Sequence, residues 1–318
     1  MSLGLDVAGP YVASRRWAAA AVRAGRRYVV PREAAEHRAA VRCTRLPRLP
    51  RSRRRPGSVW AVSMVKDEAD IVVGTVEHLL AQGVDHVLVA DNASTDGTLD
   101  LLHDLARRAP VHVAVDAEPR YFQAAKMTHL ADAARRAGAD WVVPFDADEY
   151  WFAAGMSLAG HLRATREGLL RARLFNVFPT AAGGWRLDLT PHSFGKVAIR
   201  AHWAARLGIG NHTASHPGEH VPGLYIAHYP WRSSAQLRRK GVQGGAALTD
   251  DQVARGLGKH WARFRDAEED WTDQAWTDIR EGRPRPDLWW SPVGPFRAGD
   301  PRTWDTWPAD LAIASPRR

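Results

Sequence analysis

The chain has 318 residues, 45% of them hydrophobic and 25% charged, enough to bury the core of one large α/β domain or two smaller domains. The single cysteine, Cys43, excludes an intramolecular disulfide framework and a cysteine zinc cluster, and no run of about 18 apolar residues is present to form a transmembrane helix. Arg15 and Arg16 interrupt the N-terminus before a secretory apolar stretch can form, so we expect a cytoplasmic protein.

The formal net charge of +9 is concentrated near the N-terminus. Residues 1–57 hold 14 arginines, no lysine and three carboxylates, a balance of +11, which leaves −2 for the other 261 residues. We interpret the arginine run that ends at Arg55 as a solvated linker. A basic amphipathic helix over Val12–Ala40 that contacts an anionic membrane surface is a further hypothesis, and no nucleic-acid partner is expected.

From Ser58 onward, short apolar runs alternate with segments of helical periodicity. The pattern predicts strands over 59–65, 86–90, 111–115 and 141–145, and helices from a cap at Asp70, from Leu99 and over 124–137. Uninterrupted apolar strands that alternate with helices are typical of a parallel sheet covered on both faces. The sequence therefore predicts an α/β fold with a Rossmann-like, open, mostly parallel sheet.

After Trp151 this regular alternation ends. Further strands are predicted over 169–177, 196–200 and 224–228, as a mixed extension of the sheet, followed by a basic helix from Ser233 to Lys240. Eight of the 14 tryptophans lie from Trp231 onward. Their flat faces suit sugar stacking, as does that of Trp203, although packing is the commoner use of tryptophan. We divide the chain into an Arg-rich extension (1–57), a main domain (58–245) and a Trp-rich C-terminal extension (246–318) packed on that domain.

Acidic residues follow directly after the predicted parallel strands. They are Asp67 and Glu68, Asp91 and Asp96, Asp116 and Glu118, and Asp146, Asp148 and Glu149. Ligands of open α/β sheets bind beyond the C-terminal strand ends. In residues 145–151 (FDADEYW), two carboxylates at i and i+2 can both reach a hard divalent cation that shares its shell with substrate phosphates. A turn with solvated carboxylates is the alternative interpretation.

The segment 91–98 (DNASTDGT) allows two interpretations as well. Its Ser, Thr and Asp residues are typical helix caps, and Gly97 would ease the turn. In the second interpretation, Asp91 accepts a hydrogen bond from a nucleobase or ribose at the strand tip.

Three segments, taken in order, resemble a family 2 glycosyltransferase with the GT-A fold. They are 62–69 (VSMVKDEA), 89–98 (VADNASTDGT) and 145–149 (FDADE), and the resemblance covers about residues 58–240. It implies a nucleotide-diphosphate sugar as donor, with a UDP-sugar expected, and Mn²⁺ or Mg²⁺ as cofactor. It also implies transfer, with inversion at the anomeric carbon, to a hydroxyl of a glycan, a lipid-linked or a small-molecule acceptor.

The resemblance also implies roles for individual residues. Asp67, Glu68 and Asp91 would line the nucleoside pocket. Asp146 would lie near ribose and metal, and Asp148 would ligate the metal. Lys126 is a further candidate on the nucleotide side. His228 resembles the late histidine that completes the metal shell in many GT-A enzymes, although a structural histidine is equally compatible with a strand end.

Cations near the diphosphate are expected because the main domain is close to neutral. Arg232 and Lys240 are candidates for this role, whereas Arg238 and Arg239 are expected on the outer face of their helix.

An inverting transferase also needs a base within hydrogen-bond reach of the acceptor hydroxyl. The resemblance implies a carboxylate after the D-x-D motif (Asp146 to Asp148). Glu219 is our first choice because it lies shortly before the strand predicted over 224–228, and Asp188 and Glu149 are the alternatives. The family's usual E-D pair before a Q-x-x-R-W-like helix is missing.

Two other functions are compatible with parts of the sequence. A sugar nucleotidyltransferase of related fold would need a Gly-rich, basic loop after the first strand, but residues 66–70 (KDEAD) contain no glycine. A non-catalytic carbohydrate-binding or nucleic-acid-binding protein could use the arginines of residues 1–57, but the presence of both Asp146 and Asp148 favours an enzyme.

Overall fold

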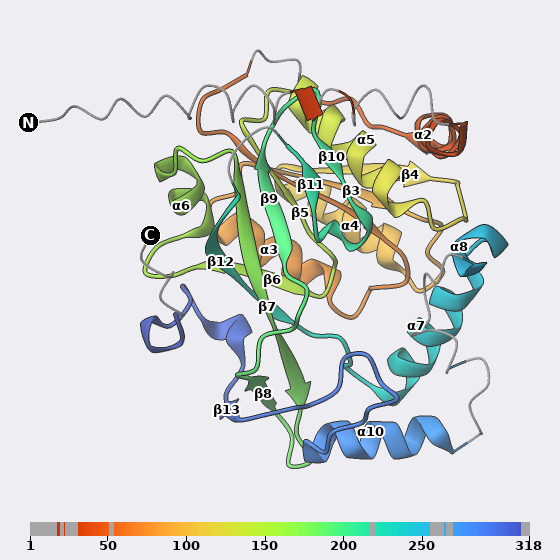
Figure 1. Cartoon of the computed structure of the whole chain (residues 1–318), viewed down its shortest axis with the longest axis vertical. Coiled ribbons are helices and arrows are strands. Elements are labelled where there is room, and N and C mark those ends of the chain that lie inside the picture. The colour runs from red at the N-terminus through yellow and green to blue at the C-terminus, as the bar shows by residue number, and fades with distance from the viewer. Residues whose placement is uncertain are drawn as a thin grey trace, which may run out of the picture.

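The computed structural model describes residues 18, 19, 22, 31–50, 54–216, 220–254, 264 and 270–312 (Figure 1). Most of the helix predicted over Val12–Ala40 lies outside these residues, and within them the chain forms α2 (Pro31–Cys43). None of the helices in this part of the chain is both long enough and apolar enough to cross a membrane.

One half of the central sheet is parallel. Its strands, in spatial order, are β4 (Val111–Asp116), β3 (His86–Asp91), β2 (Val59–Val65) and β5 (Trp141–Pro144). The short β1 (Thr44–Arg45) pairs antiparallel with β4 at the outer edge. The four strands run in the same direction. The acidic segments that follow β2, β3, β4 and β5 therefore all leave the sheet at the same end, where the carboxyl ends of these strands lie.

The other half of the sheet is mixed. Beyond β5 lie β9 (Lys196–Arg200), β7 (Leu169–Pro179), β12 (His220–His228) and β6 (Glu149–Ala153). β9 is antiparallel to β5 and β7, whereas β12 is parallel to β7 and antiparallel to β6. The predicted α/β fold, a parallel sheet with a mixed extension, is confirmed.

Helices cover both faces of the sheet. The side chains of β2 point alternately to the two faces, where two apolar cores lie. Val59 and Ala61 belong to the first core, and Trp60 and Val62 belong to the second. The first face is covered by α3 (Val72–Ala81), α4 (Thr98–Arg108) and α6 (Leu158–Ala164). The second is covered by α5 (Gln123–Arg136), on which α2 packs.

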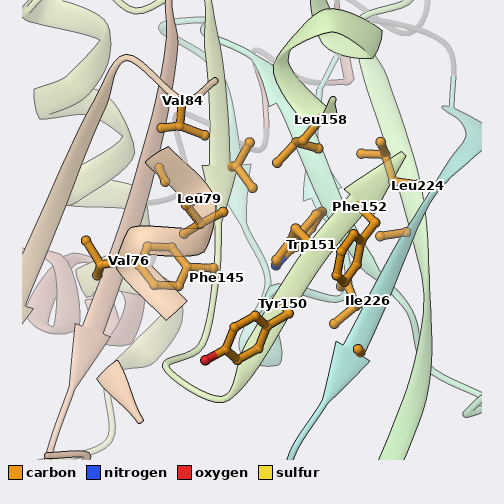
Figure 2. Packing of buried hydrophobic residues seen from close by; sticks show 14 of the residues in the cluster. Val76, Leu79, Val84, Phe145, Tyr150, Trp151, Phe152, Leu158, Leu224 and Ile226 are labelled. Carbon is orange, nitrogen blue, oxygen red and sulfur yellow. The ribbon is translucent and has the colours of Figure 1, made fainter. Parts of the chain in front are cut away.

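The first core also joins the two halves of the sheet. Figure 2 shows Val76 and Leu79 of α3 beside Phe145, with the aromatic side chains of β6 next to Ile226 of β12. The segment that carries the D-x-D motif therefore connects β5 and β6, both of which are buried.

The C-terminal elements lie at the far end of β7 (Figure 1). There β8 (Trp185–Asp188) pairs with β7 and with β13 (Phe296–Ala298), and α10 (Trp271–Glu281) packs against α7 (Ser234–Ala246) and β7. A third apolar cluster includes Trp231, Trp271 and Ile279, so these two tryptophans are packing residues. The remaining short elements are α8 (Asp250–Ala254), β10 (Arg206–Leu207), β11 (Ala214–Ser215) and 3₁₀ turns at Ile209–Asn211, Pro301–Thr303 and Ala309–Leu311.

Two local predictions were wrong. Ile71, not Asp70, is the N-cap of α3, and no side chain caps this helix, because the Asp70 carboxylate contacts Arg232. In addition, β6 begins at Glu149, where we predicted no strand. The sequence obscures β6 because its first residue is a carboxylate that becomes buried through tertiary contacts.

Candidate functional site

The loops after β2 and β3 are hydrogen-bonded to one another. The backbone N–H of Asp67 donates to Ser94 Oγ (2.9 Å), and Asp67 Oδ1 accepts from the backbone N–H of Thr95 (2.6 Å). Asp96 accepts from the backbone N–H of Thr98 (3.0 Å), but the N-cap of α4 is Gly97, which has a left-handed φ of 92° and no side chain to cap the helix. The predicted Gly97 turn is therefore present, whereas the predicted side-chain cap is not. The first two acidic segments therefore form one rigid rim.

Asp91 lies at the base of this rim and is only 1% exposed. Its Oδ2 accepts from the backbone N–H of Ser94 (3.1 Å), whereas its Oδ1 has no hydrogen-bond partner within the described part of the chain. A buried acceptor without a donor costs stability, so this oxygen is available to an N–H or O–H group of a ligand.

Asp148 is the centre of a buried group of charges. Its Oδ2 forms an ion pair with Lys240 of α7, and it lies 3.7 Å from Arg232 Nη1 and 3.6 Å from His228 Nε2. Burial alone would raise the pKa of Asp148, but the ammonium group of Lys240 holds it well below its usual value. The carboxylate is therefore ionised at neutral pH.

His228 is oriented by a second strand. It ends β12 and is paired in register with Asn176 of β7, and its Nδ1 donates to Asn176 Oδ1 (2.9 Å). Burial lowers the pKa of His228, more than Asp148 raises it, so the imidazole is neutral. With the proton on Nδ1, the Nε2 lone pair faces Asp148.

Basic side chains of α7 and the preceding loop face the acidic rim. Arg232 forms ion pairs with Glu68 and with Asp70 (2.6 Å between Nε and Oδ2), and Lys240 Nζ lies 4.0 Å from Glu68 Oε1. Arg239 donates to the backbone oxygen of Asp67 (3.0 Å). Arg238 is exposed as expected, whereas Arg239 turns inward instead of lying on the outer face of the helix.

Asp146 has different partners from Asp148. Its Oδ2 is 2.6 Å from Lys196 Nζ and its Oδ1 accepts from Asn211 Nδ2 (3.3 Å). The same lysine lies 2.8 Å from Glu149 Oε1. Burial raises the pKa of Glu149 to about 8 although Lys196 opposes the rise, and both acids of the D-x-D motif add to it. Glu149 is therefore largely protonated at neutral pH.

Lys196 and Asn176 are site residues that the sequence did not indicate, and Asn211 stood out only as part of a possible zinc cluster that its loop-like spacing argued against. Lys196 is the first residue of β9, and because β9 runs antiparallel to β5, it lies at the edge where β5 ends. The only available signal was a lysine at the start of a short strand whose three central residues are apolar.

The structure separates two predicted residues from this group of charges. Lys126 is 2% exposed and is held by Asp116 Oδ2 and by the backbone oxygen of Glu118, both at 2.6 Å. The buried Asp188 carboxylate accepts from the backbone N–H groups of Thr190 (2.9 Å), Val293 (2.7 Å) and Gly294 (3.2 Å). Asp188 therefore anchors a loop, and Glu219 lies outside the described residues.

The predicted metal ligands do not form a complete cage. Among the described residues, no three His, Cys, Asp or Glu side chains come together as a metal-binding group. Of the predicted three, Asp148 and His228 face one another, while the Asp146 carboxylate is bound by Lys196 and Asn211.

Residues 61–154 match the family model described as Glycosyl transferase family 2. The predicted resemblance to this family is confirmed. The matched segment runs from β2 to the end of β6 and includes Asp67, Glu68, Asp91, Asp146 and Asp148, so the rim and the D-x-D motif both lie within it. His228, α7 and the C-terminal elements lie beyond it. No curated protein matches the sequence.

Three solved structures are among those similar to this chain. Residues 1–349 of S. aureus TarS, in complex with UDP, share 12% identity over 68% of this chain and 77% of that chain, with a TM-score of 0.38. The mannosyltransferase PcManGT from Pyrobaculum calidifontis, in complex with GDP-Man and Mn²⁺, shares 16% over 74% and 75%, with a TM-score of 0.38. Mannosyl-3-phosphoglycerate synthase from Rubrobacter xylanophilus shares 24% over 37% and 40%, with a TM-score of 0.26.

Proposed function

We propose that the chain is a metal-dependent, inverting glycosyltransferase that moves a sugar from a nucleotide-diphosphate sugar to a hydroxyl of a glycan, lipid-linked or small-molecule acceptor. One observation carries this proposal: Lys240 and His228 both contact Asp148, and Glu68 lies beside Lys240 and forms an ion pair with Arg232. To recognise a diphosphate that joins a nucleoside to a sugar, a site needs acidic side chains at the ends of several strands and fixed cations beside them.

We assign the nucleoside side to Asp91 and the diphosphate side to Arg232 and Lys240. The Oδ1 of Asp91 is the buried acceptor that a nucleobase N–H or a ribose hydroxyl would satisfy. Arg232 and Lys240 are held by Glu68, Asp70 and Asp148, so their positive charge is in place before the donor binds. A UDP-sugar is the donor that we expect.

The residues around Asp148 fit a divalent cation. His228 Nε2 faces Asp148 Oδ2, the oxygen that Lys240 contacts in this structure and would have to share with the cation. Asn176 holds the other imidazole nitrogen in the manner usual for metal-ligating histidines. An imidazole nitrogen in the set favours Mn²⁺ over Mg²⁺, which takes oxygen ligands. When bound, the cation would supply Lewis acidity to the leaving diphosphate.

Inversion requires that the acceptor oxygen bonds to the anomeric carbon as the bond to the diphosphate breaks, while a base takes the hydroxyl proton. We propose Glu219 as this base. The Asp188 carboxylate already accepts three backbone N–H groups, and Glu149, with its raised pKa, already carries a proton and contacts Lys196. A cytoplasmic location and a membrane contact of residues 1–57 also stay predictions.

A thermal-shift screen of nucleotide sugars, with and without Mn²⁺, tests the proposed function. We expect at least one donor to raise the melting temperature in a Mn²⁺-dependent way, since a ligand at about 100 times its Kd stabilises the native state by about 2.7 kcal/mol. The stabilising donor should then release a nucleoside diphosphate in the presence of acceptor. Release of pyrophosphate would instead indicate a nucleotidyltransferase. Salt-sensitive nucleic-acid binding that is lost on deleting residues 1–57, without turnover, would indicate a binding protein.

A further inference from the structure

Two aromatic side chains form an exposed pair beside the site. Phe194 and Trp289 are 46% and 50% exposed, and their rings are stacked, with centroids 6.1 Å apart and an angle of 17° between the planes. The ring of His192 contacts both, with centroids 5.9 Å away in each case. Single exposed aromatics are common on protein surfaces, but a contiguous group of them indicates a binding surface.

One member of the pair belongs to a segment that binds an acid of the D-x-D motif, and the other belongs to a segment that contacts the neighbours of Asp148. Two residues after Phe194, Lys196 binds Asp146. Next to Trp289, the ring of Trp290 lies 5.2 Å from the ring of His228, and Lys240 Nζ is 5.5 Å from the Trp290 ring centroid. The exposed pair is therefore adjacent to the place where we assign the diphosphate.

The strand order places this pair on one particular side of the site. Along the sheet, β3, β2, β5 and β9 are consecutive neighbours, so Asp91 at the end of β3 and Phe194 just before β9 lie on opposite sides of the segment that follows β5. A donor with its nucleoside at Asp91 and its diphosphate at Lys240 leaves the side of Phe194 and Trp289 for the molecule that receives the sugar.

Both segments are held in place by buried polar contacts. Asp188 accepts from Val293 and Gly294, a few residues after Trp289, and the backbone oxygen of Trp290 accepts from Trp231 Nε1 (2.7 Å). On the other segment, the backbone N–H of His192 donates to the backbone oxygen of Leu174 (2.7 Å). A surface fixed in this way loses little conformational entropy when a ligand stacks on it.

We propose that Phe194 and Trp289 form the stacking surface for a pyranose ring of a carbohydrate acceptor. A pyranose presents an apolar C–H face that packs against aromatic rings, while its hydroxyls stay at the edge of the ring and free for transfer. Of the proposed acceptors, this inference selects those that present a carbohydrate ring. It rests on the proposed function.

Saturation-transfer NMR on the full-length protein tests the proposal, with methyl pyranosides of glucose, galactose, mannose and N-acetylglucosamine as probes, in the presence of UDP and Mn²⁺. We expect at least one pyranoside to bind through its C–H protons. Trp289→Ala and Phe194→Ala should each weaken that binding up to about tenfold, as loss of a stacking contact implies. Trp289→Phe should retain most of the affinity.

The matched control is Trp203→Ala. Trp203, which the sequence also offered for sugar stacking, is 53% exposed and contacts His202, but it follows the end of β9 opposite to Lys196 and Phe194. Its loss should therefore leave pyranoside binding unchanged. UDP affinity, measured by calorimetry, should be the same in all variants. Pyranoside binding that is equal in the wild type, Trp289→Ala and Phe194→Ala would overturn the inference, as would a wild type that binds UDP but none of the four probes. Failure of the wild type to bind any nucleotide would contradict the proposed function, which is a separate readout.

Discussion

His228 and Asp148 face one another with 3.6 Å between Nε2 and Oδ2, and Asn176 holds the other imidazole nitrogen. Burial keeps the imidazole neutral by lowering the pKa of His228, so two lone-pair atoms oppose each other in a buried place. A neutral imidazole nitrogen and a carboxylate oxygen that face one another can hold a cation together, once Lys240 leaves Asp148 Oδ2, and we assign the metal to these two residues on that geometry.

His228→Ala should therefore weaken Mn²⁺ binding strongly, and Asn176→Ala, which only frees the imidazole, should weaken it by about 10- to 100-fold. Calorimetric titration of Mn²⁺ into the protein with UDP bound measures both effects. Arg238→Ala, an exposed change on the nearby α7, is the matched control and should leave the affinity unchanged. A His228→Ala protein with wild-type Mn²⁺ affinity would remove this histidine from the metal site.

Lys240→Met should weaken binding of UDP but not of uridine. Lys240 is fixed by Asp148 and stands where we assign the diphosphate, so its loss removes a charge-assisted contact worth about 1.5–3 kcal/mol, or roughly 10- to 100-fold in affinity. Parallel titrations of UDP and uridine separate the diphosphate from the nucleoside. Arg238→Met should bind both as the wild type does. If Lys240→Met lost uridine affinity to the same extent, the lysine would have to act on the nucleoside side.

Glu219→Gln tests the proposed base. Because the amide cannot take the acceptor proton, sugar transfer should fall by about 10²- to 10⁴-fold while UDP affinity stays unchanged. Asp188→Asn serves as the comparison, since it perturbs the anchor of the loop after Trp289 and should lower thermal stability. Full transfer activity in Glu219→Gln would assign the base to another acid.

The parallel half of the sheet could be predicted because its signals are local. The strand over 59–65 is apolar except for Ser63, and Asp91 and Asp146 come at the ends of similar runs, so topology alone brought them to the same end of the sheet. Lys196 could not be predicted, because its meaning depends on Asp146, 50 residues away along the chain.

The role of Asp188 could not be predicted either, because it also depends on residues far away along the chain. An acid at the end of a strand can serve a ligand or anchor a loop, and the choice here depends on Val293 and Gly294, more than a hundred residues further on. Lys126 could also not be assigned from the sequence. A lysine on the helix before the D-x-D strand can bind a phosphate or form a buried ion pair, and in the structure it pairs with Asp116.

Lys126→Met distinguishes these two roles. Lys126 and Asp116 form a buried ion pair, and removal of one partner leaves an uncompensated charge, so the free energy of unfolding should fall by about 3–5 kcal/mol. Urea denaturation measures this loss, and the exposed Lys66→Met is the matched control, with an expected change within about 0.5 kcal/mol. UDP affinity should persist in the folded fraction. A variant of wild-type stability that no longer bound UDP would return Lys126 to the nucleotide site.

Glu149→Gln should flatten the pH dependence of stability between pH 5 and 8. Burial raises the pKa of Glu149 to about 8, against an ordinary value of 4.5, so the folded protein holds a proton that the unfolded chain releases in this window. The stabilisation is complete below pH 4.5 and is lost as the pH rises toward 8, at about 1.4 kcal/mol per pH unit. Glutamine cannot ionise, and all other titrating groups are common to both proteins. The difference in unfolding free energy between wild type and variant, from urea denaturation at pH 5, 6, 7 and 8, should therefore decrease steadily. A constant difference across this range would mean that Glu149 keeps its ordinary pKa and is ionised beside Lys196.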